Sequence, residues 1–394
     1  CKIRTRVGLI DSAGRIDWQE RALDKNSRNL LSQVWLASSP NLGYKAKHRI
    51  LDHYGGAEQA FDRFDPHARS LAGDKAYQEL AKIRLMGLDK IAAALKRIEA
   101  SVCIAGDESF PDILRDIPDP PDLLFYQGVL NRDFGRAVAI VGSRRETRYG
   151  REQAHKIARE LSENGIRVVS GLARGIDTAA HLGALEGGGH TVAVLGSGIN
   201  NIYPTENKEL AARIIASGGA VISEFAPNAD PFAFHFPFRN RLVSGLCQAT
   251  LLVEAREKSG TLITVGHALS QGREVFALPG PVDAPGSAVP HRMLREGAGL
   301  VTCARDLLED MGWTVREQGE QTQFPLPDLT NDQRRLYDAL CVEPLDFNEL
   351  QAQLDLKGIE AAQKAFQEDM AAVDQEAREE QARQSFAAPA NSGV

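Results

Sequence analysis

Six short apolar runs, each followed by a loop of small or basic residues, occupy the middle of the 394-residue chain. Most of these loops lead into a segment with helical periodicity. Short apolar strands that alternate with amphipathic helices are typical of a parallel sheet covered on both faces, in which the strand-to-helix loops leave at one edge. The pattern therefore predicts a doubly wound, mostly parallel α/β sheet. The runs span residues 137–145, 167–177, 191–198, 220–224, 249–260 and 274–280.

The loop edge of such a sheet is suited to an anionic ligand. Backbone N–H groups at helix N-termini and in glycine turns attract anions, and arginine side chains add bidentate contacts to phosphate. A Walker A pattern is absent, and Gly142 is followed by Ser143, Arg144 and Arg145 instead of G-x-G-x-x-G. We therefore expect phosphate binding without a nucleotide cofactor. No cofactor and no metal are predicted, since the five cysteines and nine histidines lack ligand spacing.

Basic residues recur in four of the loops. An isolated arginine is ordinarily a solvated surface charge, but four basic loops that converge on one edge favour an anion groove. The aromatic cluster at 232–238 precedes one of them, and aromatic rings beside arginines are typical of single-strand binding. Core packing is the alternative for most of its phenylalanines, and we expect only His235 or Phe238 near a ligand. The predicted DNA-binding residues are Gly142, Ser143, Arg144, Arg145, Arg148, Ser170, Gly171, Arg174, Gly175, His235, Phe238, Arg239, Asn240, Arg241, Lys258, Ser259, Gly260 and Thr261.

A catalytic interpretation of the same loops stays open. Asp177, His181 and Glu224 lie in or after them and suit an acid–base set. Asp177 and His181 are four residues apart on one helix face, so a local hydrogen bond that fixes the loop is the alternative.

The acidity of the chain is concentrated at its C-terminal end. The net charge is −7, and residues 331–394 hold 6 Lys and Arg against 13 Asp and Glu, which leaves 40 of each in residues 1–330. An acidic chain with a local basic field can still bind a polyanion. We therefore predict that residues 331–394 are not the main DNA-binding element. No apolar stretch reaches the ~18 residues of a membrane span, and no signal-peptide pattern is present, so we expect a cytoplasmic protein without a membrane partner.

Helical patterns flank the predicted sheet. Residues 25–98 predict a small helical domain, in which Leu80 and Leu95 lie in one longer helix. Its turn at Gly55 resembles a helix-hairpin-helix, and simple capping of a helix C-terminus is the alternative. A proline-rich stretch at 110–121 is expected to wrap a sheet edge as an ordered connector. Beyond the sheet, the pattern predicts a linker at 314–329, three short helices of a helix-turn-helix or winged-helix type at 330–374 and a disordered tail at 375–394.

These residues resemble the DNA-processing protein A family, called DprA or Smf. The match rests on Val141-Gly-Ser-Arg144, on Ser170-Gly-Leu-Ala-Arg-Gly-Ile-Asp177 with His181, and on Phe238-Arg-Asn-Arg-Leu242. Further matches are Tyr203-Pro204, Ser223-Glu-Phe225, Ser259-Gly-Thr-Leu-Ile-Thr264 and Pro279-Gly280.

The resemblance implies an extended Rossmann-like domain at 101–313, a SAM-like helical domain at 1–100 and a winged helix near the C-terminus. It also implies a homodimer that binds and protects single-stranded DNA during natural transformation, loads the RecA recombinase on it, and is not an enzyme.

A rival class has a related fold. The nucleoside-monophosphate phosphoribohydrolases carry a Gly-Gly-x-Gly-Thr-x-x-Glu loop, whose glutamate supports glycosidic cleavage. In this chain Gly260-Thr261 is followed by Leu262, Ile263 and Thr264, without a carboxylate. This departure favours a binding protein. A scaffold assembled through its helical ends is a third class, and it would not require the basic loops.

Overall fold

The structure is a computed structural model that describes residues 3–5, 8–10, 25–105, 107, 109–257 and 259–314. These residues belong to one compact unit, Cys1–Arg316. Almost all of the predicted linker, the winged-helix-like domain and the tail lie outside the described residues, and so does Lys258. The domain boundaries proposed above therefore stay predictions.

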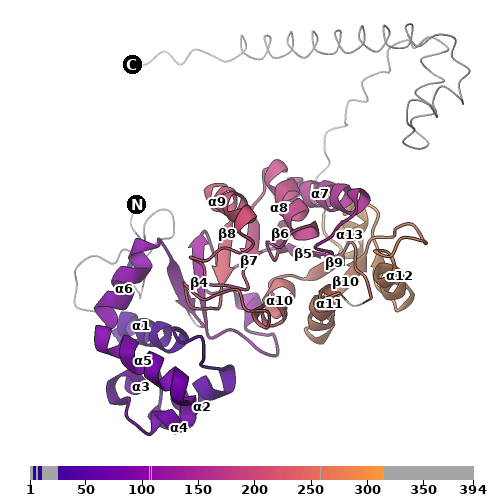
Figure 1. The fold of residues 1–394 in the computed structure, drawn as a ribbon. Helices are drawn as coiled ribbons and strands as arrows, with labels where there is room; N and C mark the ends of the chain where they lie inside the picture. Colours follow the sequence, from indigo (N-terminus) through magenta and orange to yellow (C-terminus); the bar gives the residue numbers. More distant parts are fainter. Residues whose placement is uncertain are drawn as a thin grey trace, which may run out of the picture. The chain divides into compact units, whose positions relative to one another are not determined.

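A nine-stranded sheet forms the centre of this unit, in the order β11-β10-β9-β5-β6-β7-β8-β4-β3 (Figure 1). Strands β5 to β11 run parallel to one another, whereas β4 pairs antiparallel with both β8 and β3. All six predicted strands are confirmed. The strands are β3 (Ser101–Ile104), β4 (Leu123–Gly128), β5 (Ala137–Val141), β6 (Arg167–Ser170), β7 (Thr191–Val194), β8 (Ala220–Ser223), β9 (Ala249–Leu252), β10 (Glu274–Ala277) and β11 (Gly299–Leu300). A separate antiparallel pair is formed by β1 (Ile3–Thr5) and β2 (Gly8–Ile10).

Helices cover both faces of the sheet. Most strand residues are therefore buried, whichever face their side chains point to. One face packs against α7 (Arg148–Glu163), α8 (Ile176–Glu186), α9 (Lys208–Ala216) and α13 (Ala304–Asp310). The other packs against α10 (His235–Gly245), α11 (Thr261–Ser270) and α12 (Ala288–Arg295). The predicted doubly wound, mostly parallel fold is confirmed. No helix in the described part of the chain is long and apolar enough to cross a membrane.

The proline-rich connector joins the two antiparallel strands and contains a short 3-10 turn, η1 (Asp112–Leu114). Its side chains Phe110, Leu114 and Ile117 are buried in the core that α10 also enters. The connector is therefore ordered, and it packs over one sheet face next to the edge that β3 and β4 form.

In the described residues, six helices precede the sheet: α1 (Lys25–Ala37), α2 (Tyr44–Tyr54), α3 (Ala57–Arg63), α4 (Ala68–Ala72), α5 (Asp74–Met86) and α6 (Leu88–Arg97). The expectation of one long helix through Leu80 and Leu95 is wrong. Gly87 has φ +85°, a left-handed conformation that ends α5 and turns the chain into α6. The apolar pattern continues across the break because both helices pack into the same core.

Gly55 at the end of α2 also has a positive φ, +83°, and its N–H bonds to the carbonyl oxygen of Leu51. This geometry fits the capping interpretation of that turn. The fully buried Trp35 of α1 lies in a core that also contains Phe125 of β4 and Val221 of β8. The helical segment and the sheet therefore share one hydrophobic core.

Candidate nucleic-acid interface

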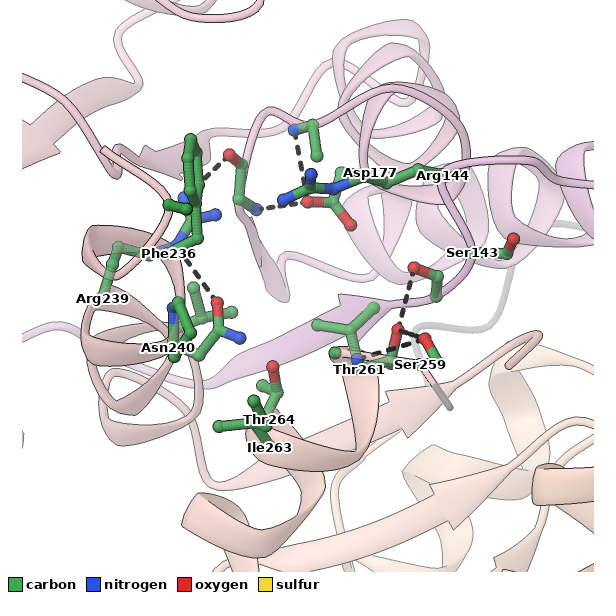
Figure 2. Close-up of a pocket in the computed structure, with 18 of the residues that line it drawn as sticks. Ser143, Arg144, Asp177, Phe236, Arg239, Asn240, Ser259, Thr261, Ile263 and Thr264 are labelled. Carbon is green, nitrogen blue, oxygen red and sulfur yellow. Dashed lines mark hydrogen bonds between the residues drawn. The ribbon is translucent and has the colours of Figure 1, made fainter. Parts of the chain in front are cut away.

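A cavity of about 760 Å³ lies at the carboxyl ends of β5 and β6, beside the starts of α10 and α11 (Figure 2). Strand β5 lies between β6 and β9 in the sheet. The connection after β5 leads to β6 on one side, and the connection after β9 leads to β10 on the other side. Such a switch point is where open α/β sheets bind ligands. Four of the segments that line the cavity contain residues predicted from the sequence.

The loop after β5 forms the first wall. The Ser143 hydroxyl accepts a hydrogen bond from Arg145 N at 3.0 Å, which fixes the turn. Thr147 then caps α7 by accepting from Gly150 N at 3.1 Å. Arg144 and Arg145 are exposed, and the Arg144 guanidinium lies 5.1 Å from the centre of the Phe236 ring. The wall therefore presents two exposed cations, of which Arg144 lies over an aromatic ring.

The loop after β6 forms the second wall. The Asp177 carboxylate accepts hydrogen bonds from Gly171 N at 3.1 Å and Ala173 N at 3.3 Å. Burial raises the pKa of this carboxyl, while Arg239 and then Arg144 act to lower it. Asp177 therefore holds the loop in place through backbone N–H groups, and the His181 ring instead bonds to the Thr191 hydroxyl. Gly175 packs against the first wall, because a Cβ there would lie 2.2 Å from the Ser143 carbonyl oxygen.

Helix α10 forms the third wall. Arg239 is 3% exposed, and its guanidinium donates to the carbonyl oxygens of Gly171, at 2.8 Å, and of Val194. Burial lowers the pKa of Arg239 to about 10, which leaves it charged at neutral pH. Its charge faces the cavity next to Asn240 (Figure 2). Arg239 thus adds fixed positive potential and ties α10 to the second wall.

The start of α11 forms the fourth wall. The Ser259 hydroxyl donates to Thr261 Oγ1 at 2.8 Å, and the Thr261 hydroxyl donates to the Gly142 carbonyl oxygen at 3.1 Å. Gly260 immediately precedes the helix, and the Thr261 N–H donates to the Ser259 hydroxyl at 3.2 Å, which fixes this turn. The exposed Arg256 also lines the cavity and was not predicted. Its position in the same loop as Lys258 was the signal available in the sequence.

The structure brings most of the predicted residues together. The cavity is lined by Gly142, Ser143, Arg144, Arg145, Gly171, Arg239, Asn240, Ser259, Gly260 and Thr261. Sequence reasoning missed Arg256, Tyr203, Phe236, Ile263 and Thr264, which also line it.

The other predicted residues that the structure describes do not line this cavity. Arg148 pairs with Glu152 at 2.7 Å, and Arg174 forms a two-point ion pair with Glu206, with 2.8 Å between Nη2 and Oε2. Ser170 is buried and donates to a strand carbonyl, and Gly175 supports the loop packing already described.

Arg241 is also turned inward. It is 3% exposed, its Nη2 lies 2.7 Å from Glu224 Oε2, and its guanidinium lies 4.0 Å from the centre of the Phe238 ring. Burial raises the pKa of Glu224, and Arg241 opposes that shift. This pair joins α10 to the end of β8.

The aromatic cluster differs from the expectation. Phe232 and Phe234 are 44% and 65% exposed and Phe236 lines the cavity, whereas His235 is buried. The reason is that α10 begins at His235, so the preceding residues do not alternate into a core. Phe238 and His235 border a second, smaller cavity.

The catalytic alternative finds no common site in this geometry. His181 is fully buried, its Nδ1 lies 2.8 Å from the Thr191 hydroxyl, and burial lowers its pKa to about 3. Asp177 is engaged by backbone N–H groups, and Glu224 by Arg241. The three side chains therefore do not converge on one cavity. Among the described residues that line the large cavity, Asp177 is the one carboxylate.

Fold and site together define a doubly wound α/β protein with a basic, glycine-rich edge. The family model described as DNA recombination-mediator protein A matches residues 101–312, more than half of the chain. The chain belongs to this family.

Similar proteins of known name support this family assignment. The chain is 43% identical to protein Smf of Escherichia coli over 226 residues, which cover 55% of this chain and 60% of that protein. It is 44% identical to DNA processing protein DprA of Streptococcus pneumoniae over 204 residues, or 52% and 72% of the two chains. The X-ray structure of DprA from S. pneumoniae covers 71% of this chain and 97% of its own, with 34% identity and a TM-score of 0.58.

Proposed function

We propose that the chain binds single-stranded DNA along the carboxyl edge of its sheet and loads a RecA-type recombinase on that strand during natural transformation. One observation carries the proposal: four arginines, two of them on the glycine loop after β5, line a single cavity that contains one carboxylate among its described residues. Such a field attracts phosphates, and Phe236 beside Arg144 offers a stacking surface for a base. The family's description as a recombination mediator supports a recombinase as partner.

A gel shift tests the binding step on the purified chain, with single-stranded DNA, duplex DNA and free nucleotides as ligands. We expect preference for the single strand with little dependence on sequence, since phosphate contacts and stacking carry little sequence information. With about four basic contacts and roughly −0.7 per neutralised phosphate, the log-log salt slope should lie near −3. A salt-independent affinity, or preference for the duplex, would contradict the groove.

Charge reversal locates the site. Replacing Arg144 and Arg174 together by glutamate should reduce single-strand affinity by at least about a hundredfold, because two attractions become repulsions. Thermal melting should hardly move, since both side chains are exposed. The matched control reverses Arg213 and Arg295, exposed arginines on α9 and α12, and should bind nearly normally. Normal binding by the first variant would move the site elsewhere, with the turn at Gly55 as the next candidate.

The phosphoribohydrolase alternative is tested by chemistry. Thr264, which lines the cavity, stands at the position where those enzymes carry their glutamate. We propose that the chain is not an enzyme, and incubation with nucleoside monophosphates, ATP or DNA should give no hydrolysis. Release of free base would favour the rival. The homodimer implied by the resemblance and the cytoplasmic location expected from the sequence are part of the same proposal, and light scattering on the purified chain measures the first.

A further inference from the structure

A second cavity, of about 300 Å³, lies between the helical segment and the sheet domain. It shares a wall with the large cavity. Residues 231–240 contribute Phe236 and Pro237 to the large cavity, and Phe234, His235 and Phe238 to the small one. A DNA strand bound in the large cavity therefore has to pass only residues 231–240 to reach the small cavity.

Aromatic rings form one side of the small cavity. The rings of Phe225 and His235 stack with 3.9 Å between centroids and 22° between planes. Phe234 meets His235 edge-on at 4.6 Å, and its outer face stacks in parallel on Phe232 at 5.6 Å. Phe234 is 65% exposed, an unusual position for a large apolar ring. The rings form a surface on which a planar group can stack.

Three charged side chains that belong to two ion pairs, Lys47, Asp122 and Glu224, also line this cavity. Lys47 Nζ lies 2.9 Å from Asp122 Oδ2, with both side chains mostly covered, and Glu224 is paired with Arg241. The two pairs balance in charge, so the small cavity lacks the positive excess that attracts phosphate to the large one. The Lys47 ammonium offers a hydrogen-bond donor and the Asp122 carboxylate an acceptor. The edges of nucleobases carry both acceptors and donors that can pair with them.

We propose that the small cavity binds one nucleobase of the strand whose phosphates occupy the large cavity, with Phe234 as its stacking surface and Lys47 and Asp122 facing its polar edge. The inference rests on the proposed function, since it assumes a single strand in the first cavity. Each nucleobase can donate to Asp122, thymine through its N3–H and the others through an amino group, which agrees with the weak sequence dependence expected above. A phosphate would meet two carboxylates there, and a purely apolar group would leave the Lys47 and Asp122 pair desolvated.

The test separates bases from backbone. The full chain is titrated by fluorescence anisotropy with a labelled oligodeoxycytidine of about 12 nucleotides, within the usual range of site sizes, and with a base-free deoxyribose phosphate strand of equal length. Phe234→Ala should weaken binding of the cytidine strand about tenfold and leave the base-free strand unchanged. Leu269→Ala, at a side chain of similar exposure on α11, is the control and should change neither.

A second variant blocks the cavity without removing its aromatic surface. Gly43 lines the cavity, has an ordinary negative φ, and has open space where a Cβ would lie, so Gly43→Tyr fills it. It should reproduce the selective loss for the cytidine strand. Equal losses on both strands, or no loss on either, would overturn the base site while leaving single-strand binding intact. If the unaltered chain binds neither strand, the proposed function itself fails.

Discussion

Arg144 and Arg174 lie on neighbouring glycine loops, yet different groups hold them in place. Arg144 lies over the Phe236 ring and is free to meet a phosphate at the cavity mouth. Arg174 is held by Glu206, which bonds both to Nε and to Nη2. This pairing raises the pKa of Arg174 and lowers that of Glu206. A phosphate that approaches Arg174 must therefore displace a carboxylate.

Glu206→Gln should raise single-strand affinity about two- to fivefold, the range expected when an exposed ion pair no longer competes. The gain should vanish when Arg174 is replaced by alanine, because no cation is then released. The four proteins form a double-mutant cycle, measured by anisotropy at fixed salt. Glu209→Gln, an exposed carboxylate in the first turn of α9, controls for the overall charge. An equal gain with and without Arg174 would reduce the effect to long-range electrostatics.

His181 makes stability depend on pH. Its pKa falls from the ordinary 6.5 to about 3, mainly through burial, so the folded state holds it neutral. The unfolded chain takes up a proton near pH 6.5, and the folded chain does so only near pH 3. The stabilisation from keeping His181 neutral is therefore complete above pH 6.5. On acidification from pH 6.5 to pH 3 the free energy of unfolding falls by about 1.4 kcal/mol per pH unit at most. His181→Gln should show a shallower decline of the unfolding free energy in this window, measured by denaturant titration at several pH values. Parallel pH profiles for the two proteins would show that His181 titrates normally.

At the scale of elements, the strands were predictable because short runs of valine, isoleucine and alanine fit only a sheet covered on both sides. The division between α5 and α6 was not, since Gly87 interrupts a pattern that both helices bury in one core. The site was predictable where loops leave the sheet. The burial of Arg241 was not, because its partner Glu224 lies 17 residues earlier in the chain and no local pattern joins the two.

Gly175 illustrates how two loops depend on one residue. It has φ +83°, and a Cβ would overlap the Ser143 carbonyl oxygen. Gly188 has a similar φ, +69°, with open space around it. Gly188→Ala should therefore cost about 1 kcal/mol from backbone strain alone, and Gly175→Ala about 2–4 kcal/mol, since overpacking adds to the strain. Denaturant unfolding measures both. Gly175→Ala should also weaken single-strand binding, because Ser143 must move. Equal destabilisation of the two variants would mean that the loops are not in close contact.

At the scale of the molecule, charge is divided unevenly along the chain. The residues up to 330 are balanced, and residues 331–394 are acidic. The compact unit ends at Arg316, so the cavity, the helical segment and the sheet all lie before this acidic region. A helix-turn-helix domain ordinarily meets phosphates with lysine and arginine, and the region has few of either. We propose that it contacts protein rather than DNA.

Truncation tests whether single-strand binding needs the residues after Arg316. A chain that ends at Arg316 keeps Trp313, which packs against the core beside α7 and lies under the Arg136 guanidinium, so the remaining unit should fold. It should keep the single-strand affinity of the full chain within about threefold, and at low salt it should bind somewhat faster, because a repulsive field of net negative charge is gone. Stopped-flow anisotropy at two salt concentrations measures both rates, and circular dichroism confirms folding. A folded truncated chain that no longer binds would assign the DNA site to residues 317–394 and would overturn the proposal that the cavity at the carboxyl ends of β5 and β6 carries it.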